Sequence, residues 1–447
     1  MARKLILLYL ILFHSISLFS QKHDQKILTL SDCIQIAMQE NSDILISKAN
    51  IVAANSSIKS AFGNYLPQAQ FTMGYSRQLN TTGGKTVNVG GQLIPIGETP
   101  PNSYNMGINL GLNIFDGFAR EANFQSASAL YDNSKLSLEH TKSFVKLNVF
   151  RLFFDYASKK KILETRRDNL ERGKKELESI RAKNQVGQLP INILYSKEAE
   201  IAGLELDWAR AENDVNLARA NLLALIGLNP NEKVEFYTED PAFNIQENEF
   251  TKFKSSIGFF EDAVQKALAN RADYQAAQKQ VESRNYQVKA VQANYFPKLQ
   301  LGGGWTWSNS QFNEFSDKGR SYIGLNLSFP IFDGFQTNTQ IQYAEFNHKS
   351  QQIQLKALEK SIRKEVEQAF LNLEAAEKQI KISEKALAAA EMNYKVLQER
   401  FNVGTANITD LIQANSQFLS AQINKINSYY YYLLSQKEVE YSIGLLN

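Results

Sequence analysis

The chain has 447 residues, and its 49 Lys and Arg residues nearly balance its 46 Asp and Glu residues. A nearly neutral chain has no global field to attract nucleic acid, so we expect no nucleic-acid partner. The single cysteine, Cys33, excludes an internal disulfide, and no metal-spacing, phosphate-loop or catalytic-triad motif occurs in the sequence. We therefore expect neither a cofactor nor enzymatic activity.

Residues 1–20 have the features of a secretory signal peptide. Arg3 and Lys4 precede an apolar run from Leu5 to Phe19, and Ser20 supplies a small residue for cleavage. The alternative is a membrane anchor, but the run is short and polar residues interrupt it. We therefore expect export of the chain and no transmembrane helix.

The mature chain is expected to begin with a helix over about 31–65 and two strands, 69–76 and 104–114. Apolar side chains alternate strictly with Gly, Asn, Gln, Thr and Ser along both strands. Such alternation is typical of a membrane strand that faces lipid on one side and a pore on the other, although a soluble sheet with one buried face shows it too. The Gly- and Pro-rich segment between the strands predicts a mobile surface loop.

A very long helix should follow. The tract from Phe118 to Asn184 contains no proline, and a helix of that length would measure about 100 Å and would need coiled-coil partners. In this tract one row of coiled-coil positions contains Lys159 and Arg166, so we expect a seam that is polar and accessible to water. A return helix over 190–227 and an irregular connection, 228–258, complete this half.

The second half repeats the same order. We expect a helix over 260–295, strands over 299–308 and 322–332, a proline-free helix over 335–402 and a return helix over 406–446. Residues that are apolar, with the exception of Ser383, recur with heptad spacing along the second long tract. They are Val366, Ala369, Leu373, Ala376, Ile380, Ser383, Leu387, Ala390, Tyr394, Leu397 and Phe401.

Two landmarks show that the halves are copies. The pentapeptide Ile-Phe-Asp-Gly-Phe occurs at 114–118 and again at 331–335, and a Val-Gly pair follows each copy at the same distance. An internal duplication of this length sets the architecture. It predicts a first helix–hairpin–helix repeat over 21–227, the connection over 228–258 and a second repeat over 259–447.

Four strands cannot close a sheet inside a lipid bilayer. Open sheet edges cannot be satisfied in lipid, and known closed barrels begin at about eight strands. Oligomerisation must therefore follow if the strands are in a membrane. Two copies would supply eight strands and three would supply twelve, and the pattern alone does not choose between them.

The order and spacing of these landmarks resemble the TolC-type outer-membrane efflux protein family. Tyr65-Leu66-Pro67 and Tyr295-Phe296-Pro297 precede the first strand of each half, and the turns and Val-Gly pairs follow. The resemblance implies a homotrimer in outer-membrane lipid that extends into the periplasm. It implies a mostly α-helical fold in which a long coiled-coil α-helical barrel continues into a twelve-stranded β-barrel with four strands from each protomer. It also implies docking to a periplasmic adaptor protein and an inner-membrane pump.

The resemblance places the docking surface at the two helical tips. The matching residues are Val186, Gly187, Val403, Gly404 and Thr405. A glycine at each tip is also expected on structural grounds, because it ends a long helix with a positive φ. The structural and the docking interpretations are compatible.

The resemblance also implies a periplasmic gate. Asp410 matches an acidic ring position, where three copies would attract cations. The second acidic position is Gln413, the aromatic gate position is Phe401 without a hydroxyl, and an Arg position is Ala406. We therefore predict a hydrophobic constriction at Phe401, assisted by Asp410, rather than a polar latch.

A purely structural role for Asp410 remains open as well. Asn407 can cap the return helix, and Asp410 then lies in the first turn, where a carboxylate favours the helix dipole. In the first repeat Ile193 stands where Asp410 stands in the second.

From the sequence we expect a passive outer-membrane channel-tunnel that exports small molecules such as drugs and toxic compounds, driven by a partner transporter. One alternative is the exit duct of type I protein secretion. A periplasmic coiled-coil scaffold and a general uptake porin are rivals of other classes.

Overall fold

The computed structural model describes residues 26–79, 86–95, 100–238, 245 and 247–446. The predicted signal peptide, residues 1–20, lies outside the described residues. The chain divides into two compact units. The helical unit comprises Met1–Ile46, Thr141–Asn270 and Ile362–Asn447, and the sheet unit comprises Ser47–His140 and Arg271–Ser361.

Two helices of 67 residues dominate the fold, as the proline-free tracts predicted. They are α4 (Ala119–Gln185) and α10 (Gln336–Asn402). Each predicted boundary lies within one or two residues of the observed one, because positive-φ turns limit the helices at both ends.

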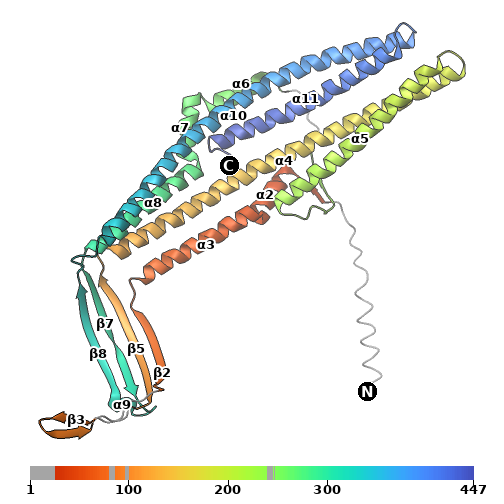
Figure 1. Ribbon diagram of the computed structural model, residues 1–447. Coiled ribbons are helices and arrows are strands. Elements are labelled where there is room, and N and C mark those ends of the chain that lie inside the picture. The colour runs from red at the N-terminus through yellow and green to blue at the C-terminus, as the bar shows by residue number, and fades with distance from the viewer. Residues whose placement is uncertain (1–25, 80–85, 96–99, 239–244, 246, 447) are drawn as a thin grey trace, which may run out of the picture. The chain divides into compact units, whose positions relative to one another are not determined.

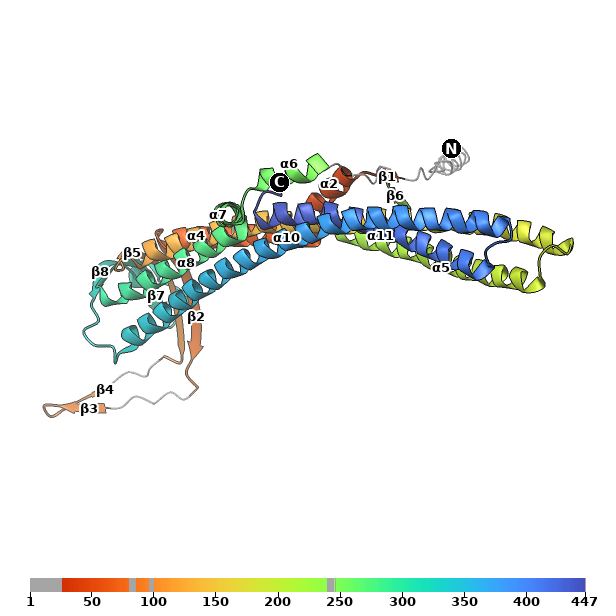
Figure 2. The same ribbon diagram turned by 90° about the horizontal axis from the view of Figure 1, so that it is seen from above.

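The return helices α5 (Ile191–Ile226) and α11 (Ile408–Ser442) pack beside α4 and α10 in the helical unit (Figures 1 and 2). Most of the predicted heptad row is buried, with Val366 and Ala376 fully inaccessible. Nearer the tip, Leu387, Ala390, Leu397 and Phe401 are half-buried. The polar seam is confirmed in part, because Gly173 and Ile180 in the same row are buried. Lys159 and Arg166 remain half-buried in ion pairs with Asp155 and Asp207.

The helix expected over 31–65 is broken into α2 (Leu30–Glu40) and α3 (Ser42–Gly63). Asn41 makes the break. Its Oδ1 accepts hydrogen bonds from the N–H groups of Asp43 and Ile44, and its Nδ2 donates to the carbonyl of Leu225 at 2.8 Å. A side chain that satisfies the first N–H groups of a helix favours a new start at that point. Cys33 is fully buried on α2, as expected for a small apolar core residue.

The helix expected over 260–295 is also broken. It consists of α7 (Phe260–Asn270), α8 (Ala272–Gln292) and the short helix η1 (Ala293–Tyr295). Arg271 separates α7 from α8 and pairs with Asp273 in the first turn of α8, with Nη2 at 2.7 Å from Oδ2.

The prediction of an irregular connection over 228–258 is wrong. The segment contains β6 (Val234–Phe236), which pairs in parallel with β1 (Lys26–Leu28), and α6 (Glu247–Ile257). Phe236 is 1% exposed and its ring packs edge-on against Tyr156. Buried apolar residues such as Val234 and Phe236 anchor the connection to the helical unit, and their burial stabilises regular structure there.

The sheet unit contains an antiparallel sheet of four strands in the order β2-β5-β7-β8 (Figure 1). The strands are β2 (Gln68–Arg77), β5 (Asn102–Phe115), β7 (Lys298–Asn309) and β8 (Gly319–Ser328), and the short helix α9 (Phe315–Lys318) joins the last two. The strand predicted to reach residue 332 ends at Ser328. Pro330 lacks the N–H that a continued ladder would require.

The segment between β2 and β5 contains a hairpin, β3 (Thr86–Val89) and β4 (Gln92–Pro95). Gly90 and Gly91 both have positive φ at its turn, as two-residue hairpin turns require. The loop prediction therefore missed regular structure here. Gly83 and Gly84, on which the predicted mobility partly rested, lie outside the described residues.

Candidate functional site

One face of the four-stranded sheet is apolar and exposed. The strand register aligns large side chains from β2, β5, β7 and β8 in rows on this face. Phe71, Met73, Leu110, Ile323 and Leu325 are between 49% and 81% exposed. A contiguous apolar surface is unfavourable in water, so this face must be covered. A lipid bilayer is the environment that suits an alternating antiparallel sheet.

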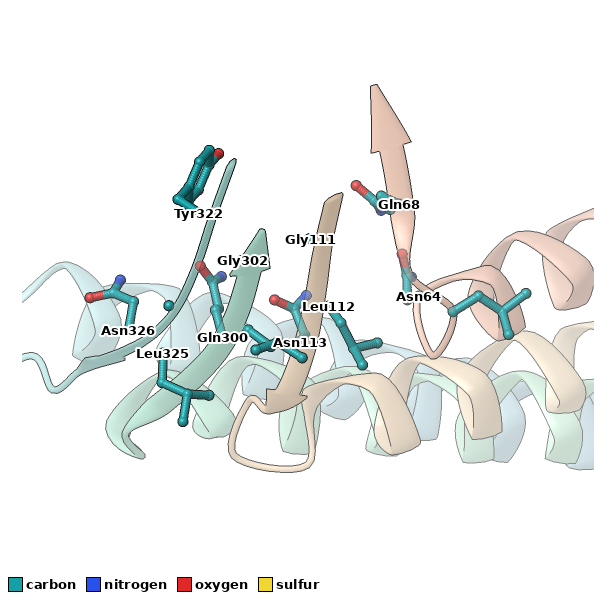
Figure 3. A pocket seen from close by; sticks show the side chains of 13 residues that line it. Asn64, Gln68, Gly111, Leu112, Asn113, Gln300, Gly302, Tyr322, Leu325 and Asn326 are labelled. Carbon is teal, nitrogen blue, oxygen red and sulfur yellow. The ribbon is translucent and has the colours of Figure 1, made fainter. Parts of the chain in front are cut away.

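The opposite face is polar, and all but two of its residues are small or uncharged. Gln68, Gly111, Gly302 and Gly324 form one row across the four strands. Asn113, Gln300 and Asn326 form the next row toward the helices (Figure 3). The alternation predicted from the sequence is confirmed, and it suits a sheet with lipid on one side and a water-filled lumen on the other.

The duplicated pentapeptide forms two equivalent turns between sheet and long helix. Gly117 and Phe118 have φ of 71° and 70°, and Gly334 and Phe335 have φ of 64° and 66°. Each Phe packs edge-to-face on the first Phe of its own pentapeptide, with ring centroids 5.4 Å and 5.5 Å apart. The first Asp of each turn, Asp116 or Asp333, accepts a hydrogen bond from the backbone N–H four residues later and so begins the helix.

Exposed aromatic rings gather at this junction. Phe118 and Phe335 are 67% and 68% exposed despite their size. Tyr295, Phe296 and Phe332 are also exposed at this end of the sheet unit. Aromatic girdles of this kind mark the boundary between lipid and water in membrane β-sheets.

The two tips of the helical unit are closed by the same backbone motif. Gly187 and Gly404 have φ of 77° and 79°. In each turn the glycine N–H bonds the carbonyl three residues before it, and the next N–H bonds five residues back, at 2.9 Å for Gln188 and 2.8 Å for Thr405. This is the Schellman arrangement that ends helices, so the structural role expected of both glycines is confirmed.

Each tip exposes one valine among polar neighbours such as Gln188 and Asn402. Val186 is 69% exposed and Val403 is 73% exposed. The second tip is further fixed by Arg400, which donates to the carbonyl of Thr405 at 3.1 Å, while the hydroxyl of Thr405 donates back to the carbonyl of Arg400.

The predicted gate residues differ in burial. Phe401 is half-buried and packs against the cluster that contains Ile180 and Leu411. Asp410 and Gln413 are both exposed on α11, three residues apart. Asn407 caps that helix, and its Oδ1 accepts from the N–H of Asp410 at 2.8 Å. The capping role is therefore present, and the carboxylate of Asp410 remains exposed.

A buried ionic network lies above the tip and was missed from the sequence. Lys197 on α5 is 1% exposed, and its Nζ lies 2.6 Å from Glu176 Oε2 on α4 and 2.7 Å from Glu200 Oε2. The Tyr394 hydroxyl on α10 donates to Glu176 Oε1 at 2.9 Å, and Asn415 on α11 donates to Glu200 Oε1 at 3.1 Å. One cluster thus links all four helices of the tip.

Burial and the neighbouring Glu176 raise the pKa of the Tyr394 hydroxyl well above its usual range. The phenol therefore remains a hydrogen-bond donor at any physiological pH. No signal in the sequence singled out Lys197 or its partners, since each reads as one of many charged helical residues.

Within the residues that the structure describes, no helix combines the length and the hydropathy needed to cross a membrane.

Comparisons with known proteins agree with this architecture. The family model described as "Outer membrane efflux protein" matches residues 33–228 and 263–445. The outer membrane protein TolC of Vibrio cholerae is 22% identical over 423 residues, covering 94% of this chain and 91% of that protein. The alignment with TolC of Salmonella enteritidis, at 24% identity, covers 61% of this chain and only 55% of that protein.

Solved structures show the same fold. The CmeC outer membrane channel of Campylobacter jejuni has a TM-score of 0.76 at 18% identity, covering 93% of this chain and 85% of that one. The outer membrane protein VceC of Vibrio cholerae has a TM-score of 0.75 at 17% identity, covering 93% of this chain and 96% of that one. The chain belongs to the outer membrane efflux protein family, the TolC-type channels of the outer membrane, which are transport proteins and not enzymes.

Proposed function

We propose that this chain is the exit duct of a tripartite efflux pump. Small toxic molecules would leave the cell through it passively, with energy supplied by an inner-membrane transporter. The periplasmic scaffold considered above is set aside, because the family consists of outer-membrane channels. The substrates, the adaptor and the pump are part of the proposal.

The observation that carries the proposal is the two-faced sheet. Its apolar face suits lipid and its polar face suits a lumen, yet in the described part of the chain β2 and β8 are each paired on one side only. Unpaired strand edges are not tolerated in lipid, so β2 of one copy must pair with β8 of another. Family membership implies a trimer, and three copies of four strands would give a barrel of twelve.

We propose that the two tips dock the periplasmic adaptor. They present exposed valines on two turns with the same pattern of backbone hydrogen bonds, which suits a partner that makes similar contacts at both tips. The residues assigned to this surface are Val186, Gly187, Val403, Gly404 and Thr405.

We also propose that Phe401 and Asp410 constrict the periplasmic end, with Gln413 one turn after Asp410 on α11. Phe401 is only partly buried in its own protomer, so part of its ring remains available to a neighbouring copy. The exposed carboxylate of Asp410 would supply three negative charges in a trimer.

Protein export is a second candidate. The Toxin and drug export protein A of Aggregatibacter actinomycetemcomitans is 20% identical over 427 residues, covering 93% of this chain and 86% of that protein. The name of that relative includes both toxins and drugs as exported cargo. A duct whose pump is a separate protein can serve either.

Complementation of a deletion strain tests the proposal. We expect deletion to raise sensitivity to dyes and antibiotics, and the wild-type chain to restore resistance. A tip variant, Val186→Asp with Val403→Asp, should reach the outer membrane as a trimer but fail to restore resistance. Val87→Asp, on the β3–β4 hairpin, is the matched control and should restore it.

Two results would count against the proposal. Resistance restored by the tip variant would exclude the tips as the docking surface. Unchanged sensitivity after deletion, together with loss of a secreted protein from the medium, would favour the secretion duct instead.

A further inference from the structure

The polar face of the sheet carries formal charge of one sign only. Every second residue of β2, β5, β7 and β8 faces this side, and these residues are Asn, Gln, Ser, Thr, Gly and one Tyr, with two exceptions. The exceptions are Lys298 and Arg320. No Asp or Glu occurs on this face in any of the four strands, all of which the structure describes.

The two cations lie at opposite ends of the sheet. Lys298 begins β7 beside the helices, where its Nζ donates to Asn294 Oδ1 at 3.0 Å. Arg320 is exposed on β8 and is aligned with Thr306, eight residues further along β7. At the usual rise of a strand, the two rows are roughly 26 Å apart.

The surroundings of Arg320 suit an anion. Thr72, Gly107 and Thr306 share its row, so hydroxyls and open backbone lie beside the guanidinium. The Tyr322 hydroxyl in the next row donates to Asn109 Oδ1 at 2.9 Å, which leaves the amide N–H₂ of Asn109 as a donor.

Nearby carboxylates do not cancel this charge. The connection between β7 and β8 contains Glu314 and Asp317, but Glu314 is paired with Lys318 at 3.0 Å. Asp317 accepts a hydrogen bond from Ser316 and lies outside the strands. The row of Arg320 itself contains no acid.

We propose that Arg320 forms an anion-binding ring near the outer end of the lumen, and that the barrel section selects for solutes carrying phosphate, sulfate or carboxylate groups. In a trimer three guanidinium groups would face one another across the pore. Rings of Arg or Lys select anions in pores, and Arg binds planar or tetrahedral oxyanions through several N–H groups at once. This inference rests on the proposed channel function.

Block of single-channel current by inorganic triphosphate tests the ring. The purified full-length protein is added to one side of a planar bilayer, and its polar helices keep the sheet end on the opposite side. Triphosphate added on the sheet side should block the wild-type current. We expect Arg320→Gln to weaken this block about tenfold or more at low salt, where charge is poorly screened.

Three controls locate the effect. Arg77→Gln removes the same side chain from the apolar side of the sheet and should leave the block unchanged. Spermidine, a trication, should not block from the sheet side. In a salt gradient, Arg320→Glu should also shift the reversal potential toward cation preference.

Equal block in wild type, Arg320→Gln and Arg77→Gln would overturn the ring. A wild-type protein that forms no pores in the bilayer would instead overturn the proposed channel function, and the ring with it. The two failures are therefore distinguishable.

Discussion

Lys197 is a buried cation whose charge is balanced by two carboxylates. It is 1% exposed and lies within 2.7 Å of carboxylate oxygens on Glu176 and Glu200. Removing one partner of a buried pair leaves an uncompensated charge, which costs about 3 to 5 kcal/mol. We expect Lys197→Met to reduce the local stability of the tip by that order, measured by hydrogen exchange of α5 and α11.

Lys174→Met is the matched control. Lys174 pairs with Glu205 between the same two helices, but both side chains are largely exposed. Such pairs contribute only about 0 to 1 kcal/mol. Equal protection factors in the two variants would show that the network around Lys197 is not stabilising.

The raised pKa of Tyr394 predicts that stability depends on pH in the alkaline range. Its folded pKa is raised above the ordinary value of 10.0, chiefly by burial and then by Glu176. Below pH 10 the phenol is neutral in both states and contributes no pH dependence. Above pH 10 the unfolded chain loses the proton first, so stability should fall as pH rises.

Tyr394→Phe separates this contribution from others. We expect a loss of about 1 to 2 kcal/mol near neutrality, from the missing hydrogen bond to Glu176, and a shallower decline above pH 10. Tyr432, whose pKa is raised to about 12, would still contribute its own decline. Parallel alkaline unfolding curves for wild type and variant would contradict the assignment to Tyr394.

A substitution at Asp410 distinguishes a role in the gate from a role at the start of α11. Asn407 already caps α11, so Asp410→Asn should lower stability by only about 0.3 to 1 kcal/mol, the usual contribution of a charge in the first turn. If three copies form an acidic ring, the same variant should abolish block by divalent cations added on the helical side. Unchanged conductance and unchanged cation block would leave Asp410 as a helix-start residue only.

At the scale of elements, the two duplicated turns allow a direct comparison. Gly117 and Gly334 both have positive φ. A Cβ on Gly117 would overlap the Ala293 carbonyl and lie 2.7 Å from the Phe296 Cβ, whereas a Cβ on Gly334 would meet nothing within 4 Å. We expect Gly334→Ala to cost only backbone strain, about 1 to 2 kcal/mol, and Gly117→Ala to cost clearly more.

Thermal unfolding of the two variants in the same detergent measures the difference. Equal losses of stability would mean that the first turn can move away from Ala293 without cost. The comparison is informative because the backbone geometry of the two turns is nearly the same.

Elements were predictable where a local sequence pattern determined them. Proline-free tracts bounded by glycine gave α4 and α10, and strict alternation gave the four strands. The breaks at Asn41 and Arg271 could not be seen, because neither position carries Pro or Gly and the break depends on contacts such as Asn41 to Leu225. The Lys197 network was equally hidden, since its members come from four helices far apart in the sequence.

At the scale of the whole molecule, the open edges of the sheet give the most direct test of assembly. Gln70 on β2 and Tyr322 on β8 belong to the same row, on opposite edges. If β2 pairs with β8 of the next copy, cysteines at these positions become neighbours between chains. We expect Gln70→Cys with Tyr322→Cys, in a Cys33→Ala background, to give covalent dimers and trimers on oxidation in membranes.

The register between copies can be staggered, because closing a barrel requires shear. Gln68→Cys and Thr72→Cys should therefore each be paired with Tyr322→Cys as well, and at least one combination should produce the ladder. Asn109→Cys with Tyr322→Cys is the control, because β7 always separates these strands. Monomers in every combination would mean that the edges do not meet, and a lipid-embedded barrel could not close. A ladder that ends at three chains fixes the barrel at twelve strands and places three copies of Arg320 around a single lumen.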